Sequence, residues 1–193
     1  MKIRLLNTAL AALLLAGTAQ AIASTDTTAG LTLSGAITPL VTGCEISLSK
    51  QLVYLEGNVS RLPHQGTNAI NPSSITAYIT GKDMEGAGSL ECSEAVKAGQ
   101  IALKFTGTAD DVEGTVLANS YTESNAAKGV GIGVFGPGNY PPVAINSGLL
   151  QYLTPLPDLR GAIQFNVELV KLTGKEVTPG NVAGALTIQI ERL

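Results

Sequence analysis

The two cysteines are the residues whose chemistry is easiest to define. Cys44 and Cys92 are the only thiols in the 193-residue chain. In an oxidising compartment such a pair forms a disulfide, which here would close a loop of about 50 residues and stabilise the fold by about 3–4 kcal/mol. A metal site lacks ligands, because the chain has one histidine and no C-x-x-C or H-x-x-x-H pair. We therefore predict a Cys44–Cys92 disulfide if the chain is exported.

A glycine pattern in the middle of the chain matches a nucleotide-binding motif. Residues 131–136 read GIGVFG, which fits G-x-G-x-x-G literally. That motif binds a pyrophosphate only where a strand ends in a helix. Residues 137–142 read PGNYPP, and this segment cannot begin a helix. We therefore predict no cofactor and interpret the glycines as positions where one strand lies close under another.

The titratable residues that could serve catalysis are isolated in the sequence. His64 follows Pro63 in a polar loop and has no evident orienting partner, so a solvated loop residue is the better interpretation. Asp110, Asp111 and Glu113 could be imagined as calcium ligands, but their spacing fits a solvated turn better. Neither G-x-S-x-G nor H-E-x-x-H occurs. We predict that the protein is not an enzyme.

The first 23 residues have the three parts of a secretory signal peptide. Lys2 and Arg4 precede an apolar run over residues 5–16, and small residues follow up to Ala23. We expect cleavage after Ala23, with Ala21 as the alternative, and no later stretch approaches the ~20 apolar residues of a membrane span. Removing the leader takes the formal charge from -3 to -5. An acidic chain with no basic cluster argues against nucleic acid or an anionic membrane as partner.

Short alternations of apolar and polar residues run through the rest of the chain, and this two-residue period is typical of half-buried β-strands. Turns rich in glycine, proline and asparagine separate the alternations. The expected strands cover residues 29–33, 44–48, 52–55, 75–79, 101–105, 112–117, 130–134, 149–153, 163–169 and 186–190. Many short strands in about 170 residues predict one all-β domain, and their number fits an immunoglobulin-like sandwich.

The stretch from Ser24 to Thr38 leaves a choice open. Its alternating residues either fold back into their own domain or reach into another one, because a strand edge can accept an extended segment from a second chain. The same choice applies to the alternation near the C-terminus. From the pattern alone, ordinary strands of a self-contained sandwich are favoured.

Several stretches together resemble the pilins of chaperone-usher fimbriae, of the type 1 fimbrial subunit kind. LTLSGAI at residues 31–37 precedes the first cysteine as it does in that family, and VGIGV at residues 130–134 resembles its glycine strand. The C-terminal segment TPGNVAGALTIQI (residues 178–190) has Gly180 fourteenth from the end and alternate apolar residues after it. The chain departs from the family at Arg192, where an aromatic residue is usual.

The resemblance implies an incomplete immunoglobulin-like β-sandwich (the pilin domain, residues 39–193) that lacks its last strand and is completed by a donor strand from another subunit. Residues 24–38 would be the donor-strand extension. The implied donor face consists of Thr25, Thr27, Ala29, Leu31 and Leu33. The implied groove-edge strand, which would also bind the chaperone, includes Gly180, Leu186, Ile188 and Ile190. The implied partners are identical subunits, a periplasmic chaperone, an outer-membrane usher and a tip adhesin subunit, without any cofactor.

These observations favour a structural subunit of a fimbria that serves cell adhesion, exported through the periplasm to the cell surface. One alternative is a minor, tip or adaptor subunit that binds a receptor through loops at residues 57–72 or 118–128. Another is a self-contained secreted β-sandwich binding domain. A two-domain adhesin is disfavoured because about 170 residues leave no room for a lectin domain. The absence of tryptophan and the three phenylalanines argue against a sugar-stacking platform.

Overall fold

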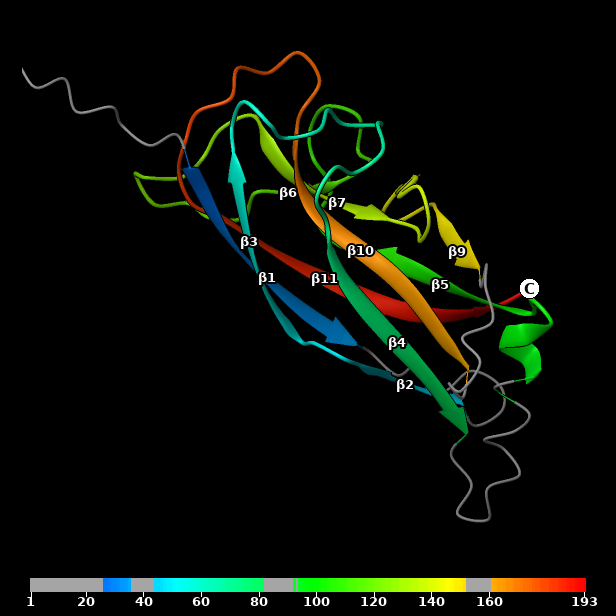
Figure 1. Ribbon diagram of the computed structural model, residues 1–193. Coiled ribbons are helices and arrows are strands. Elements are labelled where there is room, and N and C mark those ends of the chain that lie inside the picture. Colours follow the sequence, from blue (N-terminus) through cyan, green and yellow to red (C-terminus); the bar gives the residue numbers. More distant parts are fainter. Residues whose placement is uncertain (1–25, 36–43, 82–91, 93, 152–160) are drawn as a thin grey trace, which may run out of the picture.

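The computed structural model describes residues 26–35, 44–81, 92, 94–151 and 161–193, and almost all the regular structure in them belongs to two β-sheets (Figure 1). The expected signal peptide lies outside these residues, and so do residues 152–153 of the strand expected over 149–153. The two sheets share one hydrophobic core, to which strands of both contribute. The protein is an all-β, immunoglobulin-like sandwich, as the sequence predicts.

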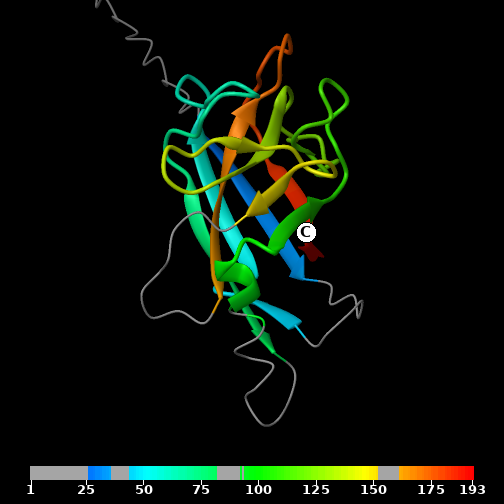
Figure 2. The ribbon, with the colours of Figure 1, turned by 90° about the vertical axis from the view of Figure 1, so that its right-hand side faces the viewer.

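The five-stranded sheet contains both ends of the described chain. Its order is β3 (Leu52–Asn58), β1 (Asp26–Gly35), β11 (Val182–Arg192), β5 (Ile101–Thr106) and β9 (Leu149–Gln151). The strand β1 runs antiparallel to β3 and parallel to β11. Figure 2 shows β1 in blue and β11 in red within the same layer.

The second sheet packs against the first and has the order β2 (Cys44–Leu48), β4 (Ser73–Gly81), β10 (Ala162–Lys171), β7 (Val130–Phe135) and β6 (Leu117–Ala118). The short β8 (Pro142–Val143) pairs with β7 beside this path. Sequence analysis did not predict β8, because proline is rare in strands except at edges. The strand expected over residues 112–117 is reduced to β6.

Apolar side chains from both sheets meet between the layers. The rings of Phe105 on β5 and Phe165 on β10 lie with their centroids 5.0 Å apart. Leu31, Ile75 and Ile132 are fully buried and come from β1, β4 and β7. The two-residue period therefore identified the inward face of each of these strands correctly.

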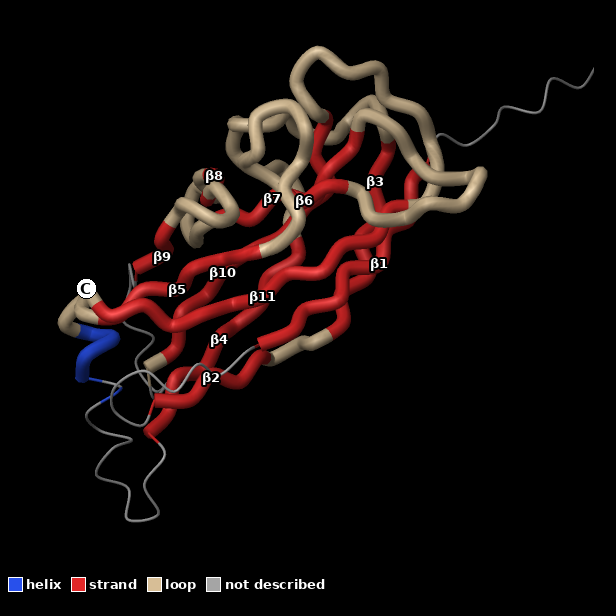
Figure 3. The backbone as a smooth tube through the Cα atoms, turned by 180° about the vertical axis from the view of Figure 1, so that it is seen from behind, coloured by secondary structure: helices blue, strands red, loops and turns tan. Residues whose placement is uncertain are grey.

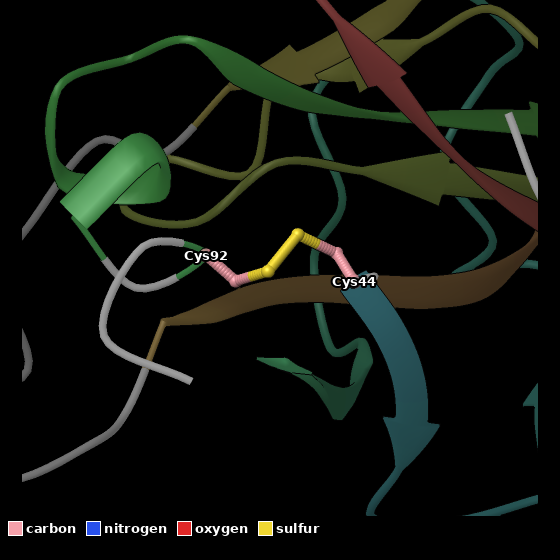
Figure 4. The surroundings of a disulfide bond; sticks show 2 residues. All are labelled: Cys44 and Cys92. Carbon is pink, nitrogen blue, oxygen red and sulfur yellow. A yellow bond between two sulfur atoms is a disulfide. The ribbon is translucent and has the colours of Figure 1, made fainter. Parts of the chain in front are cut away.

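The predicted disulfide between Cys44 and Cys92 is present, with the Cα atoms 5.9 Å apart (Figure 4). Cys44 begins β2. Cys92 is itself helical and is followed by helical residues 94–97, after which the chain enters β5. The disulfide therefore ties β2 of the second sheet to the segment that leads into β5 of the first sheet.

The glycine pattern at residues 131–136 lies on β7 and is followed by loop, as predicted. Every residue of β7 is buried. A Cβ atom at Gly131 would lie 2.8 Å from the carbonyl oxygen of Leu117 on the neighbouring β6. The glycine therefore lets two strands approach each other closely.

Candidate functional site

The position between β3 and β11 in the five-stranded sheet, called the groove below, is where the N-terminal and C-terminal segments singled out from the sequence meet. The strand β1 lies between β3 and β11 and pairs with both (Figure 3). Thr27 and Ala29 pair with Gly57 and Leu55 of β3. On the other side, Leu33 pairs with Leu186 of β11. The sequence left open whether the N-terminal stretch folds back into its own domain or reaches into another one. In the single chain, β1 folds back into its own sheet.

Two leucines anchor β1 in the groove. Leu31 and Leu33 are 0% and 3% exposed, whereas Thr32 between them faces solvent. Leu31 lies over Gly184 of β11, where a Cβ atom would be 3.6 Å from the Leu31 Cδ1 atom and 2.8 Å from that of Ile132. The absence of a side chain at Gly184 therefore leaves room for Ile132 of β7, and Leu31 packs at ordinary van der Waals distance beside it. The backbone N–H of Leu33 also donates to the carbonyl of Gln51 at 2.8 Å.

The implied donor face is described only in part. Leu31 and Leu33 point into the core, as the resemblance implies for donor residues. Thr27 and Ala29 belong to β1, and their backbone pairing alone is described. Thr25 lies outside the described residues.

The implied groove-edge residues lie on or just before β11. Leu186 and Ile188 are fully buried, and Ile190 is partly buried against the core. Gly180 precedes β11, and a Cβ atom there would lie 2.5 Å from the backbone oxygen of Asn125. Arg192 is the last residue of β11 and pairs with Ile101 of β5.

The beginning of β11 is held by Asn119, a residue that sequence analysis did not single out. Its side-chain nitrogen donates to the carbonyls of Ala127 and Asn181 at 2.9 and 3.0 Å. Its side-chain oxygen accepts from the backbone N–H groups of Tyr121 and Ala183, both at 3.0 Å. Asn119 thus satisfies backbone groups of the 119–127 loop and of β11 at once and fixes one end of the groove. No motif distinguishes it from other loop asparagines.

The prediction of a solvated turn at residues 110–113 is wrong for Asp110, which is buried. Its side chain is 6% exposed, and its carboxylate accepts hydrogen bonds from backbone N–H groups and from the Gln65 amide at 2.9–3.1 Å. Burial raises the pKa of Asp110, but the hydrogen bonds from Glu113, Val116, Val112 and Gln65 outweigh burial, so its pKa lies below the ordinary value. The carboxylate organises the turn from inside.

The other candidate residues do not form a reactive site. His64 is exposed on its loop, as predicted, and its backbone forms a bridge with Lys171. Within the described part of the chain, no three histidine, cysteine, aspartate or glutamate side chains gather in a way that could hold a metal ion. None of the helical residues described forms a segment long and apolar enough to cross a membrane.

Two solved structures of similar proteins both belong to fimbrial subunits. The P pilus rod subunit PapA is 15% identical, with a TM-score of 0.44, and the alignment covers 81% of this chain and 97% of that one. An antigen and type I fimbria protein of Burkholderia pseudomallei is 16% identical, with a TM-score of 0.39, and 86% and 92% are covered. A search of curated proteins found no match.

The family comparison covers the groove and both sheets. The model of the family described as "Fimbrial protein" matches residues 31–191. The matched region extends from Leu31 in the middle of β1 almost to the end of β11, so it includes the strands that line the groove and the disulfide between the layers. The chain belongs to the fimbrial protein family.

Proposed function

We propose that the protein is a structural subunit of a fimbria and that it polymerises by donor-strand exchange. In this reaction β1 leaves its own groove, and the β1 segment of a neighbouring subunit enters it. The observation that carries the proposal is the central position of β1, a strand from the start of the chain that separates β3 from β11. Removing such a strand leaves two unpaired edges that another extended segment can satisfy.

The energetics of β1 favour exchange over a permanently open groove. Withdrawal of β1 exposes Leu31 and Leu33, each worth about 1.5–3 kcal/mol of burial. It also unpairs the backbone of β3 and β11, which invites aggregation. A groove opened in the periplasm would therefore need a strand from a chaperone until the next subunit arrives at the outer-membrane usher.

The geometry of exchange produces a filament. A subunit that donates β1 to one neighbour and accepts β1 from another uses two different surfaces, so the contact is head-to-tail. Such a contact does not close on itself in a pair, and chain growth continues. The proposed product is a homopolymer at the cell surface that serves adhesion, ends in a tip adhesin subunit and has no catalytic role.

The test uses a mature chain without residues 24–38, refolded with its disulfide, and a synthetic peptide of residues 24–38. We expect the peptide to bind slowly, to dissociate hardly at all and to raise the thermal unfolding midpoint. A stabilisation of about 5 kcal/mol corresponds to a rise of about 10–20 °C for a domain of this size. Differential scanning calorimetry measures the midpoint.

The matched control is the same peptide with Leu31→Asn and Leu33→Asn, which keeps the backbone donors and acceptors but loses the two apolar anchors. We expect this peptide to leave the midpoint unchanged. A truncated chain that is already stable and ignores the unmodified peptide would contradict donor-strand exchange. It would instead favour a self-contained secreted binding domain.

A further inference from the structure

A trough of about 450 Å³ crosses the outer surface of the five-stranded sheet. Tyr54 and Glu56 of β3 contribute to one side. Both are exposed and alternate along the strand with the buried Val53 and Leu55, so they lie on the outer face of the sheet. Tyr121, from the loop before β7, lines the trough as well. The Tyr54 side chain is 75% exposed, so the trough opens to solvent.

The floor of the trough is low because two small residues occupy neighbouring strands. Gly30 of β1 pairs with Tyr54 of β3 on one side and with Ala183 of β11 on the other. A Cβ atom at Gly30 would meet no atom within 4 Å, so the space above it is open. The trough therefore owes its depth to the missing side chain of Gly30.

The Tyr121 side of the trough is held in place by hydrogen bonds. The preceding residue, Ser120, donates from its backbone nitrogen and its hydroxyl group to the carbonyl of Ala183, at 2.8 and 2.9 Å. The N–H of Tyr121 donates to Asn119, which also binds the N–H of Ala183. The loop that carries Tyr121 is thus fixed to the strand that supplies the floor.

The residues around the trough have the chemistry that binds organic cations. The lining includes two tyrosines, Asn181, and Glu56, which brings a negative charge. The lining contains no lysine or arginine. Ammonium ions are attracted to aromatic faces, and aromatic cages bind choline and methylated lysine in this way. A volume of 450 Å³ lies within the usual range for small-molecule sites.

We propose that this trough binds an organic ammonium ion, either a choline-type head group or a lysine side chain presented by another molecule. Because the site is open and shallow, its affinity is modest, with a Kd on the order of 1 mM. The proposal does not depend on polymerisation, since the trough exists in the single chain with β1 in its own groove.

The experiment is an NMR titration of the mature chain from residue 24 with choline chloride and, separately, with Nα-acetyl-lysine-N-methylamide, whose side-chain ammonium group is free. We expect saturable shifts of backbone signals confined to Gly30, Tyr54, Tyr121 and their neighbours. Binding of choline alone identifies a head-group site, and binding of the lysine compound alone identifies a side-chain site. The uncharged isostere 3,3-dimethylbutanol tests the role of charge, and we expect its shifts to be at least tenfold weaker.

Two variants on β1 form a matched pair. Gly30→Val fills the trough from its floor without a clash, and we expect it to abolish the shifts while leaving the unfolding midpoint unchanged or higher. Thr32→Val places the same new residue on the same exposed face but outside the trough lining, and we expect this variant to bind the cations like the unmodified chain. Tyr54→Ala should weaken binding about tenfold, and Glu56→Gln about threefold.

Three results would overturn the proposal. The first is the absence of saturable shifts up to about 50 mM of either cation, well above the expected Kd. The second is equal binding by the uncharged isostere, which would show that charge has no part in recognition. The third is unchanged binding by a folded Gly30→Val chain, which would place the ligand elsewhere.

Discussion

The Asp110 carboxylate is buried, and the partners described for it are all N–H groups. Its Oδ1 atom accepts from the backbone of Val112 and Glu113, and its Oδ2 atom accepts from Thr115 and Val116. The Gln65 amide adds a further donor to Oδ2 at 3.0 Å. Hydrogen bonds to a charged acceptor contribute more to stability than neutral ones. This residue therefore holds the turn that leads into β6.

Replacement of Asp110 by asparagine should destabilise the protein by about 2–3 kcal/mol at pH 7, because an NH₂ group would then face N–H donors. The pKa of Asp110 is lowered in the folded state, so unfolding takes up a proton in acid. The contribution of the carboxylate is thus complete above its ordinary pKa of 3.8 and is lost as the pH falls through the lower folded value. Urea unfolding at several pH values measures the difference from the unmodified chain.

Asp111 is the matched control for this change. Its side chain is 81% exposed and lies 3.6 Å from Lys175. Exposed ion pairs contribute little, so Asp111→Asn should change the free energy of unfolding by less than about 0.5 kcal/mol at any pH. Equal effects of the two substitutions would mean that burial of Asp110 has no energetic consequence.

The burial of the apolar residues in β1 and β11 could be predicted from the sequence, whereas the burial of Asp110 could not. Leu31, Leu33, Leu186 and Ile188 follow from a two-residue period, which is local information. The burial of Asp110 depends on a turn geometry and on Gln65, a residue 45 positions earlier. Such long-range hydrogen bonds leave no pattern in a single sequence.

At the level of the elements, the glycines of β7 and β1 have opposite roles. Gly131 on β7 faces the carbonyl of Leu117 on β6 at a distance that excludes a side chain. Gly30 on β1 has open space above it. Both lie within strands and look equivalent in the sequence.

These two glycines give a paired prediction. Gly131→Ala should destabilise the protein by about 1–3 kcal/mol, because the new methyl group forces β6 and β7 apart. Gly30→Ala should be neutral or stabilising by up to about 1 kcal/mol, because alanine restricts the unfolded chain more than glycine does. Chemical unfolding of both variants measures the effects. A Gly30→Ala cost as large as that of Gly131→Ala would contradict the open space described above β1.

The position of β1 could not be predicted from its pattern. Alternation at residues 29–33 indicates a strand with one buried face, which the structure confirms for Leu31 and Leu33. The same alternation suits an edge strand, a central strand or a strand inserted into another molecule. Its neighbours, β3 and β11, are determined by the rest of the fold.

At the scale of the whole molecule, the disulfide connects the two layers at one end. Replacing both Cys44 and Cys92 by serine should lower the free energy of unfolding by about 3–4 kcal/mol. The disulfide joins residues 48 positions apart, and without it the unfolded chain regains conformational freedom. The thermal midpoint should fall by about 6–16 °C. Calorimetry of the variant and of the unmodified chain measures this difference.

A reducing agent supplies the control for this prediction. It should lower the midpoint of the unmodified chain toward that of the double-serine variant and leave the variant unaffected. A variant with the midpoint of the oxidised chain would show that the covalent link adds nothing to packing between the layers.

The pairing of β1 with β11 has a consequence for synthesis. Ala29 pairs with Val182, so β1 cannot complete its pairing until the much later β11 has been synthesised. Non-local pairing of this kind forms late in folding. A chain broken off before residue 182 can form most of the second sheet, but it lacks the strand that joins β1 to β5. A chain without β11 therefore leaves β1 and β5 each with an unpaired edge, and unpaired edges favour aggregation.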